Sequence, residues 1–173
     1  LRQGAPKVLL AVAGGLVAFF IASYTGVLLS VTNRPIWADT SLLGLLFLVS
    51  AASTAAALLL LLGRRQITPA SVGWLKQMDK WALLFELLVL LAVVISLGAV
   101  AQAWLSVWGI LLLVGVVLVG NLLPLALHWR PGLLGGMSTP AAAVLVLIGG
   151  FILRAVIVLS SEGLEEVTAW LLR

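Results

Sequence analysis

Glu86 and Arg154 are the residues whose chemistry needs explaining first, because each interrupts a long apolar stretch. An ionisable side chain at the centre of a membrane helix costs at least about 2.5–3.5 kcal/mol on insertion scales. Arginine does not lose its proton in practice, so Arg154 must face protein, water or a ligand. A carboxyl group such as Glu86 can hold or release a proton. The pair therefore points to a bound polar ligand, a proton relay, or both.

Tyr24 and Asn121 are further polar residues in the same apolar stretches. At about 1.5 Å per residue, Tyr24 lies roughly 24 Å and Arg154 roughly 21 Å from the cytoplasmic ends of their helices, as assigned below. By the same rise, Glu86 and Asn121 lie about 8 Å and about 9 Å from those ends. We therefore predict two polar layers about 13 Å apart, without a direct Glu86–Arg154 ion pair. The four residues form our candidate proton path.

Each layer also has a structural interpretation. Glu86 can be a neutral carboxyl group hydrogen-bonded to Asn121. Arg154 can extend toward the outer membrane surface or pair with Glu162, two turns further along. His128 lies at the inner end of its expected helix, where we interpret it as a solvated group near the helix C-terminus and not as a ligand.

The composition defines the environment of these residues. The chain of 173 residues is 63% hydrophobic and 9% charged, whereas soluble domains are about 45–50% apolar and about 25% charged. A soluble globular domain and a disordered chain are both excluded. With no cysteine and one histidine, the chain alone cannot hold a thiolate-bound iron–sulfur cluster or a bis-histidine haem. We expect no metal site, and we attribute the net charge of +4 to basic loops at a membrane and not to a nucleic-acid partner.

Hydropathy predicts an all-α integral membrane bundle of about five transmembrane helices, forming a single domain over residues 1–173. A span needs roughly 20 mostly apolar residues, so the uncharged run after Glu86 must fold back near residues 98–106. The expected helices cover about residues 8–31, 41–62, 81–98, 106–127 and 140–160. Before the third helix, Trp74, Lys76 and Lys80 have helical spacing, which predicts a segment lying on the membrane surface.

Basic residues set the orientation of these helices. Cytoplasmic loops of membrane proteins carry an excess of lysine and arginine. One side of the expected bundle holds seven basic residues, namely Arg2, Lys7, Arg64, Arg65, Lys76, Lys80 and Arg130. The other side holds Arg34 and Arg173. We therefore expect the N-terminus in the cytoplasm and the C-terminus outside the membrane.

The first outer loop follows the helix that carries Tyr24. Asn33 and Arg34 supply hydrogen-bonding groups there, and Pro35 biases the preceding residue away from helix. The loop is either a lid or docking edge over a site in the outer half of the membrane, or a turn in which Trp37 serves as an interfacial anchor.

An ordered set of motifs carries a resemblance to a known family. It consists of Tyr24-Thr25-Gly26, Asn33-Arg34-Pro35-x-Trp37, Glu86, and Gly149-Gly150-Phe151-Ile152-Leu153-Arg154-Ala155-Val156-Ile157-Val158. From about Val8 to Ser161, the chain resembles the C-terminal part of the polysulfide-reductase membrane-anchor (NrfD-like) family. Ala155 replaces an aromatic residue that is usual in that motif.

This resemblance implies a quinone-reactive, haem-free anchor in a bacterial or archaeal cytoplasmic membrane, with menaquinone as the expected quinone. It implies a ferredoxin-like iron–sulfur subunit and a molybdopterin catalytic subunit as partners. It places Tyr24, Asn33, Arg34 and Trp37 at or near the quinone, and Tyr24, Arg154 and Glu86 on a polar route to the bulk phase. Family members have several preceding helices, so further helices are expected from a longer chain or a partner.

The leading hypothesis is a quinone-interacting subunit that passes electrons between an iron–sulfur partner and the membrane quinone pool. The chain then has no redox centre of its own, and we assign it no catalytic residue. An alternative is a proton- or ion-coupled transporter subunit, for which Glu86 and Arg154 are equally natural, although no internal repeat supports it. A third is a purely structural anchor.

Overall fold

A computed structural model describes the chain except for residues 1–3, 33–36, 64–66, 99–105 and 172–173, and except for the side chains of residues 131 and 161–173. The described residues form helices and connecting turns, without strands. Five helical segments are long and apolar enough to cross a membrane, which confirms the predicted all-α membrane bundle. They are Ala5–Ser30 (α1), Leu43–Leu62 (α2), Pro69–Leu97 (α3), Val107–Trp129 and Gly135–Ser160.

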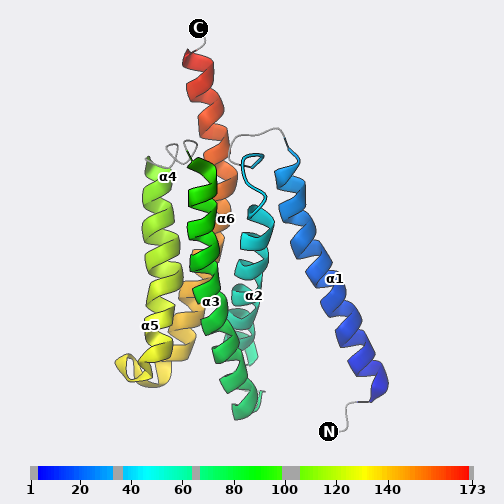
Figure 1. The fold of residues 1–173 in the computed structure, drawn as a ribbon. Coiled ribbons are helices and arrows are strands. Elements are labelled where there is room, and N and C mark those ends of the chain that lie inside the picture. The colour runs from blue at the N-terminus through cyan, green and yellow to red at the C-terminus, as the bar shows by residue number, and fades with distance from the viewer. Residues whose placement is uncertain (1–3, 33–36, 64–66, 99–105, 172–173) are drawn as a thin grey trace.

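Four of these segments pack into a bundle, and α1 leans against its side (Figure 1). We call the end at which α1 begins the inner end, and the opposite end the outer end. Buried aliphatic side chains of α2, α3, the fourth segment and α6 (Ser138–Leu171) form the main core. This core includes Leu46, Val93, Val116 and Ile157. Polar residues on these helices are therefore held at defined heights between packed apolar layers.

Glycines set the closest helix contacts. A Cβ atom on Gly26 of α1 would lie 2.0 Å from the Cα of Gly44 on α2. A Cβ on Gly149 of α6 would lie 2.2 Å from the Cα of Gly120 in the fourth segment. Small residues allow such backbone approach in membranes. A Cβ atom added to Gly14 or Gly15, by contrast, would meet no atom of a neighbouring helix within 4 Å. The inner half of α1 thus diverges from the bundle, whereas its outer half contacts α2 (Figure 1).

The fourth segment changes helix type along its length. It consists of α4 (Val107–Ile110), the π-helix η3 (Leu111–Leu122) and α5 (Leu123–Trp129). The side-chain amide of Asn121 donates to the carbonyl oxygen of Val116, five residues back, at 3.1 Å. Pro124 follows and has no N–H to donate. Short π-helical stretches within α-helices are frequent at functional sites.

The third helix is longer than the sequence predicted. It begins at Pro69 and not near residue 81, because Thr68 accepts a hydrogen bond from the Ser71 N–H at 3.3 Å and proline occupies the first turn. Leu75 then packs against Leu60 and Ala56 of α2, in place of the separate surface-lying segment expected there. Likewise, α6 runs from Ser138 to Leu171 and not from about 140 to 160, since no proline interrupts it after Pro140.

Candidate functional site

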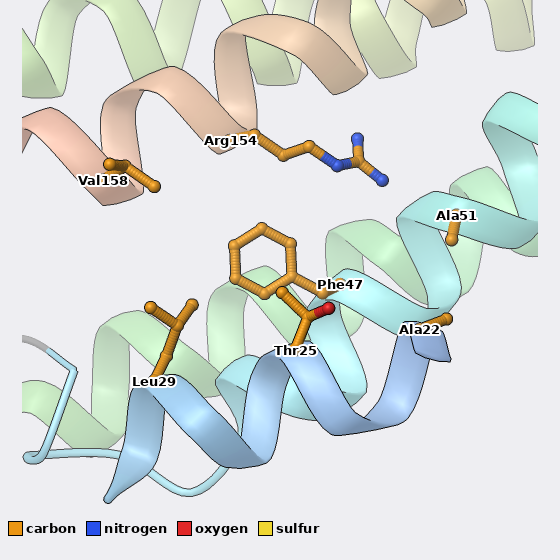
Figure 2. Close-up of a pocket in the computed structure, with 7 residues that line it drawn as sticks. All are labelled: Ala22, Thr25, Leu29, Phe47, Ala51, Arg154 and Val158. Atoms are coloured by element: carbon orange, nitrogen blue, oxygen red, sulfur yellow. The ribbon is translucent and has the colours of Figure 1, made fainter. Parts of the chain in front are cut away.

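A pocket of about 330 Å³ lies between α1, α2 and α6 in the outer half of the bundle (Figure 2). Such a volume falls in the range of small-molecule sites, about 300–1,000 Å³. Thr25 and Arg154 are the polar members of its described lining, and the other members are apolar. These apolar residues are Ala22, Leu29, Phe47, Ala51 and Val158. A largely apolar wall with one permanent cation favours an apolar ligand that carries a hydrogen-bond acceptor.

Arg154 extends from α6 over the ring of Phe47 (Figure 2). Its guanidinium carbon lies 6.0 Å from the ring centroid, within the range of a cation–π contact. Its Nη1 donates to the carbonyl oxygen of Gly150 at 2.8 Å. The side chain therefore points one turn back along α6, as side chains on a helix do. The alternative that Arg154 extends toward the outer surface is wrong, and the side chain of Glu162 lies outside the described residues.

Gly150 makes this conformation of Arg154 sterically feasible. A Cβ atom at Gly150 would lie 3.2 Å from Nη1 of Arg154 and 2.5 Å from Cγ2 of Thr54. It would also lie 3.6 Å from Oγ of Ser50. The guanidinium of Arg154 is thus held beside the polar residues of α2, at the boundary between the pocket and the bundle interior.

Glu86 lies inside the bundle on α3 with 4% of its surface exposed. Ser50 of α2 adjoins its carboxyl group, and the charges of Arg154 and Asp79 act on it. No ion pair within 4.0 Å joins Glu86 and Arg154 in the described part of the chain, as the depth argument predicted. The prediction of two separate polar layers is wrong for the side chains, because Arg154 reaches back along α6 toward Ser50, which adjoins Glu86. The carboxyl group of Glu86 is therefore near the guanidinium of Arg154 but not bonded to it.

Asn121 does not form the hydrogen bond to Glu86 that the structural interpretation required. Its amide donates instead to Val116, because the wide turn of η3 brings that carbonyl within reach. Its Oδ1 atom is buried without a hydrogen-bond partner among the described residues. The same is true of Ser50 Oγ. Buried polar atoms are nearly always hydrogen-bonded. Asn121 Oδ1 and Ser50 Oγ therefore belong to a polar interior whose hydrogen bonds are not all satisfied by the described residues.

The structure also shows a polar cluster that sequence reasoning missed. Asp79 of α3 is completely buried. Its Oδ1 accepts a hydrogen bond from Ser53 of α2 at 2.7 Å, and its Oδ2 lies 2.8 Å from Nε2 of His128 on α5. The interpretation of His128 as a solvated cap is wrong, because its side chain is 5% exposed and bonded to Asp79. The sequence feature that could have revealed this cluster is the seven-residue spacing of Asp79 and Glu86, because it places both acids on one face of α3.

The predicted pairing of Tyr24 with Arg154 is not formed. Tyr24 is 54% exposed on α1 and stacks on Phe20, with ring centroids 6.1 Å apart. Its neighbour Thr25 lines the pocket instead (Figure 2). Adjacent residues of a helix point about 100° apart around its axis. Tyr24 can therefore lie at the same height as Thr25 and still face away from Arg154. Tyr24 therefore lies at the predicted depth but faces away from Arg154.

The first outer loop is described in part. Asn33 and Arg34, both expected near a ligand, lie outside the described residues. Trp37 is half-buried, and its Nε1 donates to the carbonyl oxygen of Ile157 on α6 at 2.9 Å. This bond fastens the loop to α6 less than one turn from Val158 of the pocket. Trp37 thus closes the outer end of the bundle beside the site.

Five apolar helices around a charged interior define a multi-pass membrane protein. A sequence model of the polysulfide reductase family, of NrfD type, matches residues 3–166. The chain belongs to this family, whose membership indicates a membrane subunit of a redox complex. Searches of curated proteins and of solved structures each found no match.

Proposed function

We propose that this chain is the quinone-interacting membrane subunit of an oxidoreductase complex, with the quinone head group beside Arg154. The observation that carries the proposal is the position of this guanidinium in an apolar pocket over an aromatic ring. Quinones are apolar rings with carbonyl oxygens that accept hydrogen bonds. A guanidinium has five N–H donors, and among the described residues that of Arg154 makes one hydrogen bond. The residues therefore fit the ligand.

The chain's own residues have distinct tasks in this pocket. Arg154 donates hydrogen bonds to a carbonyl oxygen and stabilises negative charge on it. Phe47 and the aliphatic wall bind the ring and exclude water. The Thr25 hydroxyl already donates to the carbonyl oxygen of Ile21 at 3.0 Å, so Thr25 contributes shape and not a donor. A bound quinone supplies the two-electron, two-proton redox chemistry.

The divergence of α1 supports a lateral entrance for such a ligand. The most apolar stretch of α1 has no buried residue, and a Cβ atom added to Gly14 or Gly15 would have open space around it. A lipid-soluble molecule can therefore approach Ala22 and Thr25 from the bilayer between α1 and the bundle. The other exposed apolar faces of α1 offer surface on which further membrane helices of the complex would pack.

Proton handling falls to the interior beneath Arg154. Ser50 lies between the Gly150 backbone and Glu86, so it connects the pocket boundary to the carboxyl group. Asn121 supplies an unpaired oxygen in the same interior. We therefore retain Arg154, Glu86 and Asn121 in the proton path, add Ser50, and assign Tyr24 no step.

The redox centres of the complex are assigned to partner subunits. The chain contains no cysteine and one histidine, so a ferredoxin-like iron–sulfur subunit, and with it a molybdopterin subunit, would exchange electrons with the quinone. The pocket lies near the outer end. The described basic residues Lys7, Lys76, Lys80 and Arg130 belong to the start of α1, the first half of α3 and the end of α5, which lie toward the inner end. By the positive-inside rule the inner end faces the cytoplasm of a bacterial or archaeal cell.

Arg154→Leu in the intact complex tests this proposal. Quinone-linked turnover should fall by a factor on the order of 10², while subunit assembly and turnover of the catalytic partner with a soluble dye are retained. Arg130→Leu removes a charge at the exposed inner end and should leave both activities unchanged. Wild-type quinone turnover in Arg154→Leu would refute the quinone site. Ion flux through the chain without partner subunits would favour the alternative, a transporter subunit.

A further inference from the structure

The Asp79 cluster lies apart from the quinone pocket and joins three helices at the inner part of the bundle. Asp79 comes from α3, Ser53 from α2 and His128 from α5. Two turns of α3 separate Asp79 from Glu86. Arg130, two residues after His128, is exposed. The cluster therefore lies between the buried carboxyl group of Glu86 and the aqueous phase at the inner end.

Each of the two carboxyl groups of α3 lies near a serine of α2, and among the described residues a hydrogen bond joins Ser53 to Asp79 but not Ser50 to Glu86. Ser53 donates to Asp79, and Ser50 adjoins Glu86. These serines are three residues apart, hence neighbours on one face of α2. Hydroxyl groups accept one proton while donating another. The serine face of α2 thus lies alongside both acids of α3, with no direct hydrogen bond between Ser50 and Ser53 among the described residues.

A neutral imidazole has one ring nitrogen that can accept a proton. Addition of one proton to a neutral imidazole beside the Asp79 carboxylate changes the net charge of the pair from −1 to zero. A neutral pair is less costly than a lone anion in a low-dielectric interior. The other charged groups on the surrounding elements are Lys76, Lys80 and Glu86 on α3, Arg130 after α5 and Arg154 on α6, and α2 carries none. Three glutamates of α6, Glu162, Glu165 and Glu166, belong to its outer part, where side chains lie outside the described residues.

We infer that His128 and Asp79 form the proton-exchange site between the inner aqueous phase and Glu86. A proton from water binds the imidazole of His128 and passes to the Asp79 carboxylate. The Ser53 hydroxyl then accepts it and releases its own proton toward Ser50 and Glu86. No electron moves in these steps. The assignment of Glu86 as the destination rests on the proposed function.

Infrared spectroscopy of the full chain within its complex tests the site. The complex is placed in liposomes in one orientation, and pH is changed on one side at a time. The carboxyl band removed by Asp79→Asn should respond to pH at the inner side. Asp79→Glu, which keeps a carboxyl group, should shift the same band and provides a second assignment.

His128→Gln keeps a hydrogen-bond donor near Asp79 but does not titrate. It should slow the response of the Asp79 band by at least about 10-fold, the scale of a lost acid–base group. Lys76→Gln, one turn away on α3, should respond as the wild type does. A response to the outer side, no response, or an unchanged rate in His128→Gln would overturn the inference.

The outcome is independent of the quinone assignment, because the infrared measurement needs no quinone and no turnover. A wild-type Asp79 response together with quinone turnover that survives Arg154→Leu would refute the proposed function alone. An unresponsive Asp79 band together with the predicted loss in Arg154→Leu would refute the proton-exchange site alone.

Discussion

Nη1 of Arg154 lies 2.8 Å from the carbonyl oxygen of Gly150, one turn back on the same helix. This hydrogen bond directs a permanent cation away from the outer surface and over the ring of Phe47. The residue that accepts the bond is a glycine because a side chain there would meet both Thr54 and the guanidinium. The position of the Arg154 guanidinium therefore depends on the absence of a side chain at Gly150.

Gly150→Ala should displace the guanidinium of Arg154. Its Cβ would lie 2.5 Å from Thr54 Cγ2 and 3.2 Å from Arg154 Nη1. We expect quinone-linked turnover to fall by a factor on the order of 10, because small displacements of a positioning group are costly. Thr54→Ser removes the clashing methyl group, so the double variant should recover much of the activity. A double variant no better than Gly150→Ala would contradict this account.

Gly26→Ala should separate α1 from α2. The new Cβ would lie 2.0 Å from the Cα of Gly44, and backbone atoms cannot move aside as a flexible side chain does. Overpacking of this kind costs about 1–3 kcal/mol in the free energy of unfolding. Reversible unfolding in mixed detergent measures it. Gly15→Ala is the matched control on the same helix, where a Cβ meets nothing within 4 Å, and its stability should equal or exceed that of the wild type.

Tyr24→Phe and Phe47→Leu should differ in their effect on quinone turnover. Tyr24 is exposed and faces away from the pocket, so loss of its hydroxyl should change the rate by less than about twofold. Phe47 is buried beneath the guanidinium, and its replacement removes the aromatic surface of the site. We expect the quinone KM to rise by a factor on the order of 10. Steady-state kinetics of the two variants would refute the pocket if Tyr24→Phe were the more damaging.

Asp79 and His128 should be coupled in stability. Replacement of His128 by leucine leaves Asp79 buried with Ser53 as its remaining partner, and replacement of Asp79 leaves His128 without this contact, each at a cost of about 1–3 kcal/mol. The double leucine variant removes both polar groups, so its loss should be smaller than the sum of the single losses by about 0.5–3 kcal/mol. A double-mutant cycle in detergent unfolding measures this coupling. Additive losses would show that the 2.8 Å contact contributes no interaction energy.

Long uncharged runs were enough to predict the five membrane helices, because hydrocarbon requires continuous apolar helix. The start of α3 was missed because Trp74, Lys76 and Lys80 resemble a surface segment. Burial of Asp79 depends on Ser53 and His128, which are distant in sequence. The register that joins α3 to α5 cannot be obtained from periodicity within either helix.

The position of a site residue along its helix could be predicted from the sequence, whereas the direction in which its side chain points could not. Thr25, the neighbour of Tyr24, lines one pocket with Arg154, as matching depth predicts, but α1 is largely apolar and gives no sign of which face meets the bundle. Contact between Gly26 and Gly44 sets that face, and it turns Thr25 inward. The bond from Asn121 to Val116 was likewise unpredictable, because it requires the wide turn of η3.

Photolabelling with an azidoquinone most directly tests the central claim that the Arg154 pocket binds a quinone. The probe is added to the intact complex in membranes, and labelled peptides are mapped by mass spectrometry. We predict labels on Ala22–Leu29 and Phe47–Ala51, competed by unlabelled quinone and lost in Arg154→Leu. Labels confined to the separate groove of Leu45, Trp81 and Phe85 between α2 and α3, or labelling unaffected by Arg154→Leu, would contradict the claim.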